Sequence, residues 1–367
     1  MAHPLSGANL GTLADAFRQG GRPDHWGRAA SIWGAALGRA PISLAERAMI
    51  ARQLPQTSEM SPPIFILGHW RSGTTHLYNT MSHGAFGYVP PVAVGLPWDM
   101  FGIARALRPL LERALPEHRW IDRIPVTPTS PQEDEIAIAS MTDLSFYHGI
   151  YFPREFDRLI DRGLFFDGCS EAEIDQWRSR FTYFLRKLYL QQGKPLLIKN
   201  PVYTARVGEL RRLFPGAKFI HIHRNPFDVF LSMRNFYARL LEVMALQKVP
   251  EGLDVDATIL RVYDRMMQDF AEQTSDLAAP DFVEIPYARL DEDPMGALAE
   301  IYGTLKLEGF EAARPAFETY LTSVKSFRKN AFRGDRATVE MLCERWRQWI
   351  ERWGYVPPTL SGTGAPA

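Results

Sequence analysis

Residues 64–77 decide the fold, and their sequence is Ile64-Phe65-Ile66-Leu67-Gly68-His69-Trp70-Arg71-Ser72-Gly73-Thr74-Thr75-His76-Leu77. The apolar run Ile64–Leu67 follows two prolines and predicts a short buried strand. The loop after it predicts an anion-binding site, because glycines such as Gly68 and Gly73 let backbone amides approach a ligand closely. A helix that begins near Thr74 would add unpaired N–H groups and the positive end of its dipole.

This loop has the glycine spacing of a loop that binds nucleoside triphosphates, but it lacks the lysine. Such loops carry a lysine directly after the second glycine, where Thr74 stands in this chain. The difference argues against ATP or GTP as the ligand. Arg71, inside the loop, supplies a cation and a fork of N–H donors instead. An anion loop from another kind of α/β enzyme remains an alternative at this point.

Three further apolar runs predict buried strands, at Leu196–Ile198, Lys218–His223 and Phe282–Ile285. Helical patterns lie between the runs, at 170–193, at 203–214 and from Asn225 onward. Strands that alternate with helices predict an α/β fold, here a P-loop-like three-layer sandwich with a central parallel sheet flanked by helices. Ligands of such folds bind beyond the carboxyl ends of the strands, where the anion loop also lies.

A second motif follows the third predicted strand, and its sequence is Arg224-Asn225-Pro226-Phe227-Asp228-Val229-Phe230-Leu231-Ser232. A nucleoside triphosphatase tends to place a Mg²⁺-binding aspartate at the end of such a strand, but Arg224 stands there. The order and spacing of Arg71-Ser72-Gly73-Thr74-Thr75 and of this second motif resemble those of sulfotransferases. These enzymes use 3′-phosphoadenosine 5′-phosphosulfate (PAPS) as donor, and the likeness is to a bacterial branch similar to the tyrosylprotein-type enzymes.

The resemblance assigns roles to individual residues. It implies that the loop binds the 5′-phosphosulfate through Gly68, Arg71, Ser72, Gly73, Thr74 and Thr75. It places Arg224, Ser232 and Lys329 at the 3′-phosphate. Lys199, which follows the second predicted strand, would join Arg71 in neutralising charge on the sulfuryl and bridging oxygens. The segment from Tyr287 to Pro294 resembles one that lies near the nucleotide in this family. No metal ion is implied.

A general base must take the proton of the acceptor hydroxyl, and the acidic run 133–135 is the leading candidate. Ser130 and Glu133 also have the spacing of a capping box, which would explain Glu133 without a catalytic role. We expect Glu133 to be the base, with Asp134, Glu135 and His148 as alternatives. Tyrosylprotein-type enzymes carry their base much nearer the phosphate loop, so the chain departs from that pattern here.

Composition narrows the class of protein further. The 367 residues contain 42 Lys and Arg against 42 Asp and Glu, a balance that argues against a dedicated nucleic-acid-binding protein. The two cysteines, Cys169 and Cys343, fit neither a zinc spacing nor a disulfide framework. We see no signal-peptide pattern and no apolar run of about 18 residues, so we expect a cytoplasmic protein without a transmembrane segment.

The expected organisation has three parts. Residues 1–61 form an N-terminal helical segment with helices at 10–19, 26–38 and 44–54; residues 62–356 form the sulfotransferase domain; and residues 357–367 form a disordered tail. Inside the domain, the proline-rich and apolar stretch 84–128 predicts an irregular insertion or lid, either a packed wall or part of the acceptor site.

The predicted activity is transfer of a sulfuryl group from PAPS to a hydroxyl of a small-molecule or lipid-like acceptor. The sequence gives neither the identity of the acceptor nor the oligomeric state of the enzyme. Two other functions stay open. One is a nucleotide-dependent kinase that uses the P-loop-like spacing, and the other is a non-catalytic nucleotide-binding protein.

Overall fold

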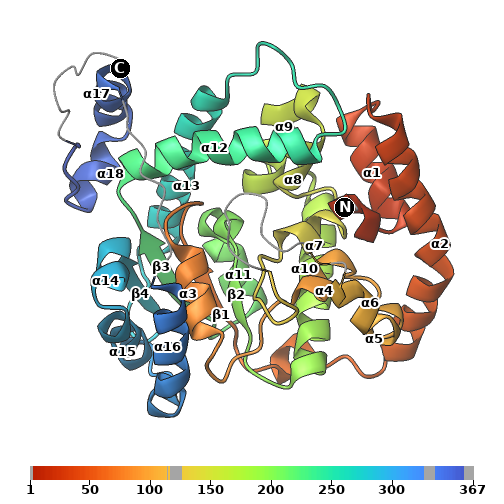
Figure 1. The fold of residues 1–367 in the computed structure, drawn as a ribbon, viewed down its shortest axis with the longest axis horizontal. Helices are drawn as coiled ribbons and strands as arrows, with labels where there is room; N and C mark the ends of the chain where they lie inside the picture. The colour runs from red at the N-terminus through yellow and green to blue at the C-terminus, as the bar shows by residue number, and fades with distance from the viewer. Residues whose placement is uncertain (1–2, 114, 116–125, 326–334, 359–367) are drawn as a thin grey trace.

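A computed structural model describes residues 3–113, 115, 126–325 and 335–358 of the chain. At its centre lies a four-stranded parallel sheet in the order β2-β1-β3-β4 (Figure 1). The strands are β1 (Ile64–Leu67), β2 (Leu197–Lys199), β3 (Lys218–His223) and β4 (Phe282–Pro286). The four predicted strands are confirmed, with ends that differ by at most one residue, and so is the α/β fold class.

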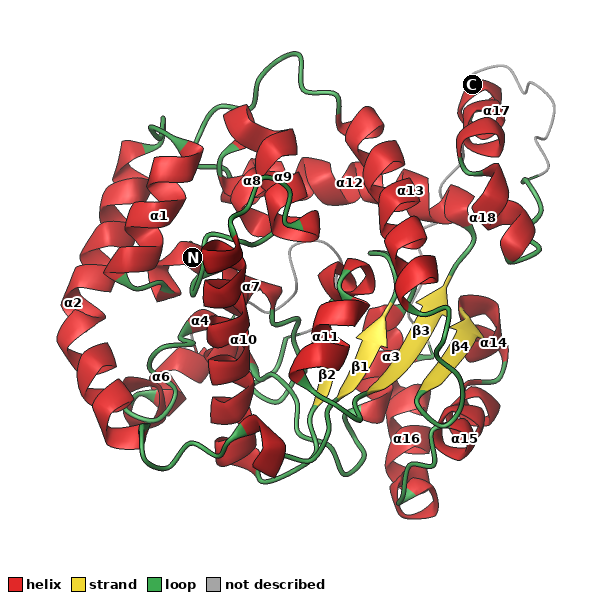
Figure 2. Cartoon of the chain, turned by 180° about the vertical axis from the view of Figure 1, so that it is seen from behind, coloured by secondary structure: helices red, strands yellow, loops and turns green. Residues whose placement is uncertain are grey.

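Successive side chains of β1 enter two different hydrophobic cores. Ile64 and Ile66 pack with α3 (Thr74–Met81), α14 (Tyr287–Glu292), α15 (Pro294–Thr304) and α16 (Phe310–Val324). Phe65 and Leu67 belong to the larger core on the other face, which includes residues of α10 (Glu171–Gln192), α11 (Val207–Leu213) and α13 (Val255–Gln273). Figure 1 shows α3 and α16 in front of the sheet. Figure 2, which views the molecule from behind, shows α11 over the opposite face. This alternation makes the three layers of the sandwich.

The strand register brings the ends of the strands to one edge. Ile66 of β1 is paired with Lys199, the last residue of β2, and Leu67 is paired with His221 of β3. The loops that follow β1, β2 and β3 therefore begin beside one another. β1 is the middle of these three strands, so its loop lies between Lys199 on one side and the end of β3 on the other.

Further helices lie outside these layers (Figure 1 and Figure 2). They are α1 (Leu10–Gly20), α2 (Trp26–Ile50), α4 (Pro91–Gly95), α5 (Ile103–Ala106), α6 (Arg108–Arg113), α7 (Glu135–Ala139), α8 (Tyr147–Tyr151), α9 (Phe156–Phe165), α12 (Pro226–Met244), α17 (Arg336–Arg345), α18 (Arg347–Arg352), and the short 3₁₀ helices η1 (Pro4–Gly7), η2 (Thr57–Glu59), η3 (Pro153–Glu155) and η4 (Pro201–Ala205). In Figure 1 and Figure 2, α1 and α2 lie at the side of the molecule away from β4. None of the described helices is both long and apolar enough to span a membrane.

Two predicted helix boundaries are wrong. The helices expected at 26–38 and 44–54 are one continuous helix, α2, which passes through Pro41. Side chains on both sides of Pro41 bond to the segment around Asp99, and these contacts hold the helix together across the missing N–H. The helix expected at 203–214 is instead η4 followed by α11, because Arg206 leaves the helical conformation between them at φ −131°.

Candidate active site

The loop between β1 and α3 has three residues with positive φ: Gly68 at 141°, Arg71 at 70° and Gly73 at 95°. A Cβ on Gly73 would lie 2.2 Å from Cδ2 of Tyr287, and one on Gly68 would lie 2.3 Å from the carbonyl oxygen of Ile222. Only glycine fits both positions. Because Gly73 is also the N-cap of α3, no side chain at the N-cap can accept the N–H groups of the first turn. The loop therefore has the form of an anion cradle.

The two motifs predicted to hold one donor lie in contact. Nε of Arg71 donates to Oγ of Ser232 over 2.7 Å, although 161 residues separate them. Nη1 of Arg224 donates to the carbonyl oxygen of Arg71 over 3.3 Å. The Arg224 guanidinium also lies 4.9 Å from the centroid of the Tyr287 ring and 3.2 Å from an oxygen of Asp228. Two cations, a serine hydroxyl and an aromatic ring thus gather at the side of the loop that faces β3.

Lys199 and Glu133 meet on the other side of the loop. Nζ of Lys199 donates to Oε1 of Glu133, and it also donates to Oγ1 of Thr75 over 3.2 Å. The side chain of Lys199 is 1% exposed and that of Glu133 is 14% exposed. The contact joins three of the predicted site residues, one from the loop, one from β2 and one from the acidic run.

The acidic run does not form the predicted capping box. The helix α7 begins at Glu135, two residues after Glu133, and Oγ of Ser130 accepts from the backbone N–H of Thr127 instead. The carboxylate of Glu133 is drawn to the buried ammonium of Lys199. The capping interpretation of Glu133 is therefore wrong.

The two carboxylates that follow Glu133 are buried and committed to structural partners. Asp134 accepts from the hydroxyl of Tyr203 and from Nδ2 of Asn200, the latter over 2.9 Å. Glu135 accepts from Nδ2 of Asn200 over 2.8 Å and from Oγ of Ser145 over 2.6 Å. Burial raises the pKa of Asp134 to about 7 and also raises the pKa of Glu135. Of these three acidic residues, Glu133 is the one with partial exposure.

The histidines near the site are held in the core. Nε2 of His148 lies 3.1 Å from the carbonyl oxygen of Ala139 and 3.0 Å from that of Thr142, and burial lowers its pKa. Nδ1 of His221 lies 2.7 Å from Oε2 of Glu284, and that of His223 lies 2.8 Å from the Tyr355 hydroxyl. Both histidines of β3 are therefore hydrogen-bonded residues of the core. The geometry of His148 gives no support to its use as a base.

Sequence reasoning missed the second layer of the site. The N–H of Gly68 donates to Oγ1 of Thr204 over 2.8 Å, and Asn200 ties the acidic run to the end of β2. Asn200 directly follows Lys199 and precedes Pro201. Its place next to a predicted site residue was the signal in the sequence that could have indicated a role at the site. Lys329, predicted at the 3′-phosphate, lies outside the described residues.

Comparisons with known proteins identify the family and the fold. A model of the family described as "Sulfotransferase family" matches residues 62–312. The chain is 29% identical over 324 residues to omega-hydroxy-beta-dihydromenaquinone-9 sulfotransferase Stf3 of Mycobacterium tuberculosis (strain CDC 1551 / Oshkosh) and to that of Mycobacterium bovis (strain ATCC BAA-935 / AF2122/97), which covers 86% of this chain and 80% of each relative.

Solved structures of two mycobacterial enzymes share the fold. Sulfotransferase STF9 from Mycobacterium avium matches 96% of this chain and 98% of its own with a TM-score of 0.67 at 16% identity. Sulfotransferase STF1 from Mycobacterium tuberculosis H37Rv matches 92% and 91% with a TM-score of 0.62 at 18% identity. Because the family model covers more than half of the residues, this chain belongs to the sulfotransferase family and is an enzyme that transfers a sulfuryl group.

Proposed function

We propose that this sulfotransferase uses PAPS as donor and a hydroxyl of a lipid-like molecule as acceptor. The observation that carries the proposal is the meeting of two cationic groups around one loop: Arg71 and Arg224 with Ser232 on one side, and Lys199 with Glu133 on the other. The donor carries a phosphate at each end of its ribose and a sulfuryl group beyond one of them. Such a ligand needs separated cations rather than one.

The strand order supports an orientation for the donor. Neighbouring strands lie about 4.8 Å apart, so the ends of β2 and β3 lie about 10 Å apart, with the loop of β1 between them. In our proposal the 5′-phosphate lies over the loop amides, the 3′-phosphate lies toward Arg224 and Ser232, and the sulfuryl group lies toward Lys199. Arg71 reaches Ser232 in this structure, and we place it between the two phosphates, within reach of the bridging oxygen.

Each residue then has a chemical task. An oxygen of the acceptor forms a bond to sulfur while the bond from sulfur to the 5′-phosphate oxygen breaks, and the proton of the hydroxyl passes to Glu133. Lys199 offsets the negative charge that grows on the departing oxygen, in an environment where burial strengthens the interaction. The second product is 3′,5′-bisphosphoadenosine. The contact between Lys199 and Glu133 keeps the cation and the base on the same side of the loop.

A lipid-like acceptor is supported by the relatives. The two Stf3 relatives are named as sulfotransferases of an omega-hydroxy-beta-dihydromenaquinone-9. Such an acceptor carries its hydroxyl on a long apolar body. The cytoplasmic location and the division of the chain at residue 61 remain predictions from the sequence.

The test uses PAPS labelled with ³⁵S and a panel of acceptors that includes farnesol, linear alcohols and phenols. We expect label to move to an apolar alcohol, and we expect Glu133→Gln to lower kcat by about 10²-fold or more. Glu155→Gln, which changes a partly exposed glutamate paired with Arg158, is the matched control and should keep the wild-type rate. Transfer of phosphate from γ-³²P-ATP in place of sulfuryl transfer would contradict the proposal and favour a kinase.

A further inference from the structure

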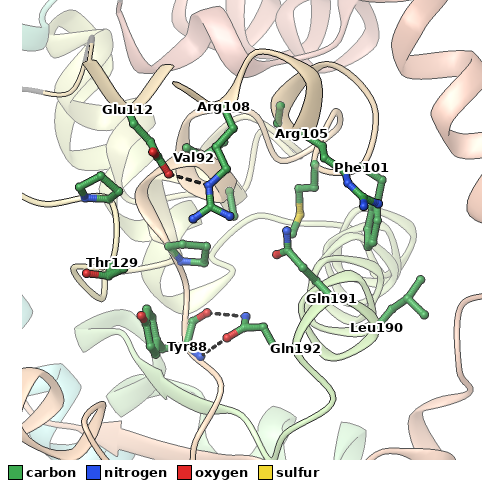
Figure 3. A pocket seen from close by; sticks show the side chains of 15 residues that line it. Tyr88, Val92, Phe101, Arg105, Arg108, Glu112, Thr129, Leu190, Gln191 and Gln192 are labelled. Atoms are coloured by element: carbon green, nitrogen blue, oxygen red, sulfur yellow. Dashed lines mark hydrogen bonds and ion pairs between the residues drawn. The ribbon is translucent and has the colours of Figure 1, made fainter. Parts of the chain in front are cut away.

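A cavity of about 570 Å³ lies between the C-terminal end of α10 and the described part of the stretch 84–128 (Figure 3). Val92, Met100, Phe101 and Leu190 form its apolar wall. Arg105 and Arg108, both labelled in the close-up of Figure 3, lie at its polar side, and both residues are exposed to solvent. Its volume is in the range of sites for small ligands, and its mixed lining suits a molecule with an apolar body and a polar end.

The cavity wall is bonded to the segment that carries the candidate base. Thr129 lines the cavity four residues before Glu133. The N–H of Gln132 donates to the carbonyl oxygen of Val89 over 2.9 Å, so the two segments run side by side. Tyr88, which precedes Val89, lines the cavity. The side chain of Gln192 accepts from the backbone N–H of Tyr88 over 3.1 Å and donates to the carbonyl oxygen of Tyr88 over 2.8 Å. The wall is therefore fixed on one side to α10 and on the other to the acidic run.

The opposite wall is held by buried charges from α2 and α10. Oε2 of Glu46 accepts from the backbone N–H groups of Phe101 and Gly102, over 2.9 and 2.6 Å. Its other oxygen accepts from Nζ of Lys187 over 2.8 Å, and that ammonium also donates to the carbonyl oxygen of Pro97 over 2.9 Å.

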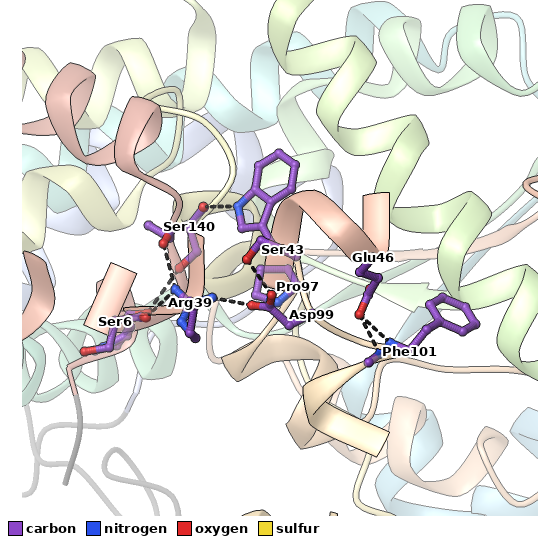
Figure 4. Close-up of polar contacts among 12 residues, drawn as sticks. Ser6, Arg39, Ser43, Glu46, Pro97, Asp99, Phe101 and Ser140 are labelled. Atoms are coloured by element: carbon purple, nitrogen blue, oxygen red, sulfur yellow. Dashed lines mark hydrogen bonds and ion pairs between the residues drawn. The ribbon is translucent and has the colours of Figure 1, made fainter. Parts of the chain in front are cut away.

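The buried carboxylate of Asp99 adds a second anchor. It binds Ser43 and Arg39 of α2, which lie about one and two helical turns before Glu46 (Figure 4). Residues 97–102, which carry Met100 and Phe101 to the cavity, are thus bonded at both ends of the segment.

Such buried charges cost desolvation free energy and add little stability compared with apolar residues of the same size. Their effect here is to fix one conformation of a segment that has no regular secondary structure. The segment presents two large apolar side chains to an open cavity, so the fixed conformation keeps the cavity from collapsing. Glu46 lies outside residues 62–312 that match the family model, so α2 supports from behind a cavity whose lining residues all lie within that range.

We propose that this cavity receives the apolar body of the acceptor, a long-chain amphiphile whose hydroxyl reaches Glu133, and that Glu46 is a positioning residue for its wall. The inference rests on the proposed function, since it names the acceptor site of the same reaction. The inference predicts that substitutions in this cavity change the selectivity for the chain length of the acceptor and leave the affinity for the donor unchanged.

The test compares linear primary alcohols from hexanol to dodecanol as acceptors. Ala104 is buried and lines the cavity, so Ala104→Leu and Ala104→Trp reduce its volume in two steps. We expect the ratio of kcat/KM for dodecanol to that for hexanol to fall by about tenfold or more in the larger variant. Glu46→Ala should lower the same ratio at temperatures well below its Tm, while the affinity for 3′,5′-bisphosphoadenosine stays within twofold. Ala313→Leu, on α16, which packs on the opposite face of the sheet from α10, is the control and should leave the ratio unchanged.

Binding of dodecanol is measured separately by calorimetry, with 3′,5′-bisphosphoadenosine present. The cavity is supported if dodecanol binds the wild type and this binding is lost in Ala104→Trp, or is weakened in Ala104→Leu where the larger variant does not fold. If dodecanol binds in this way but no alcohol is sulfated, the result counts against the proposed function and not against the cavity. An unchanged ratio and unchanged dodecanol binding in the folded variants would overturn the inference.

Discussion

Replacing Lys199 by methionine tests the centre of the proposed chemistry. Methionine keeps an unbranched apolar stem and removes the ammonium, which in the wild type contacts Glu133 and Thr75 and is 1% exposed. Two unit charges about 4 Å apart interact by about 4 kcal/mol at the effective dielectric constant of a protein site. Part of that interaction is already made with Glu133 before the reaction. About 3 kcal/mol then remains specific to the transition state, which corresponds to a loss of about 10²-fold in kcat.

The assay is a single-turnover experiment with labelled PAPS and dodecanol, together with calorimetry of 3′,5′-bisphosphoadenosine binding. We expect the dissociation constant of the bisphosphate to change less than about threefold, because our proposal places its 3′-phosphate on the Arg224 side of the loop. Lys218→Met is the matched control, since Lys218 begins β3 at the opposite end of the sheet and binds the carbonyl oxygen of Pro280. A variant of Lys199 that loses donor affinity by about 100-fold and keeps its kcat would refute the assignment.

Three further predictions concern the donor site and its supports. Arg224→Ala should raise the dissociation constant of 3′,5′-bisphosphoadenosine by about 10- to 100-fold, as measured by calorimetry, because it removes a charged hydrogen-bond donor worth about 1.5 to 3 kcal/mol. Gly73→Ala should cost about 1 to 3 kcal/mol by urea unfolding and abolish donor binding, because of its φ of 95° and the Tyr287 ring 2.2 Å from the new Cβ. Gly216→Ala, at φ 82° but without such a clash, should keep donor binding. Asp134 has a pKa raised by burial from 3.8 to about 7, so the folded state retains a proton that the unfolded state releases, and stability should fall as pH rises from about 4 to 7. Urea midpoints at pH 5 and pH 8 should therefore differ less in Asp134→Asn than in the wild type, and an equal difference in both would be evidence against a raised pKa.

The strands were predictable because the sequence left them few alternatives. Each is an apolar run of three to six residues between turn signals, and a run that short cannot form a stable helix by itself. The loop residues Gly68 and Gly73 were predictable for a similar reason, since their role depends on local backbone conformation. Arg224 and Ser232 could be paired with this loop through the resemblance to a family, and the structure places both motifs in contact.

Glu133 illustrates what local patterns cannot decide. A capping contact is worth about 0.5 to 2 kcal/mol, whereas a buried charge left without a partner costs about 3 to 5 kcal/mol. The ammonium of Lys199 is buried, so the structure in which Glu133 pairs with it is preferred over one in which Glu133 caps a helix. This partner lies 66 residues along the chain, and no pattern around residue 133 reveals it. Pro41 is the same case for a helix, because distant contacts of α2 outweigh a local break.

The pairing of Glu133 with Lys199 is reinforced one residue further along both segments. Asn200 follows Lys199 and donates to Asp134, which follows Glu133. The same amide group donates to Glu135, so the two segments are joined by consecutive side-chain contacts rather than by one. Because the contacts of Asn200 are buried and hydrogen-bonded, we expect them to hold the backbone in place if Glu133 and Lys199 separate during the proposed reaction. In our proposal the three carboxylates of the acidic run therefore differ in role: Glu133 takes the acceptor proton, and Asp134 and Glu135 hold the segment that carries it.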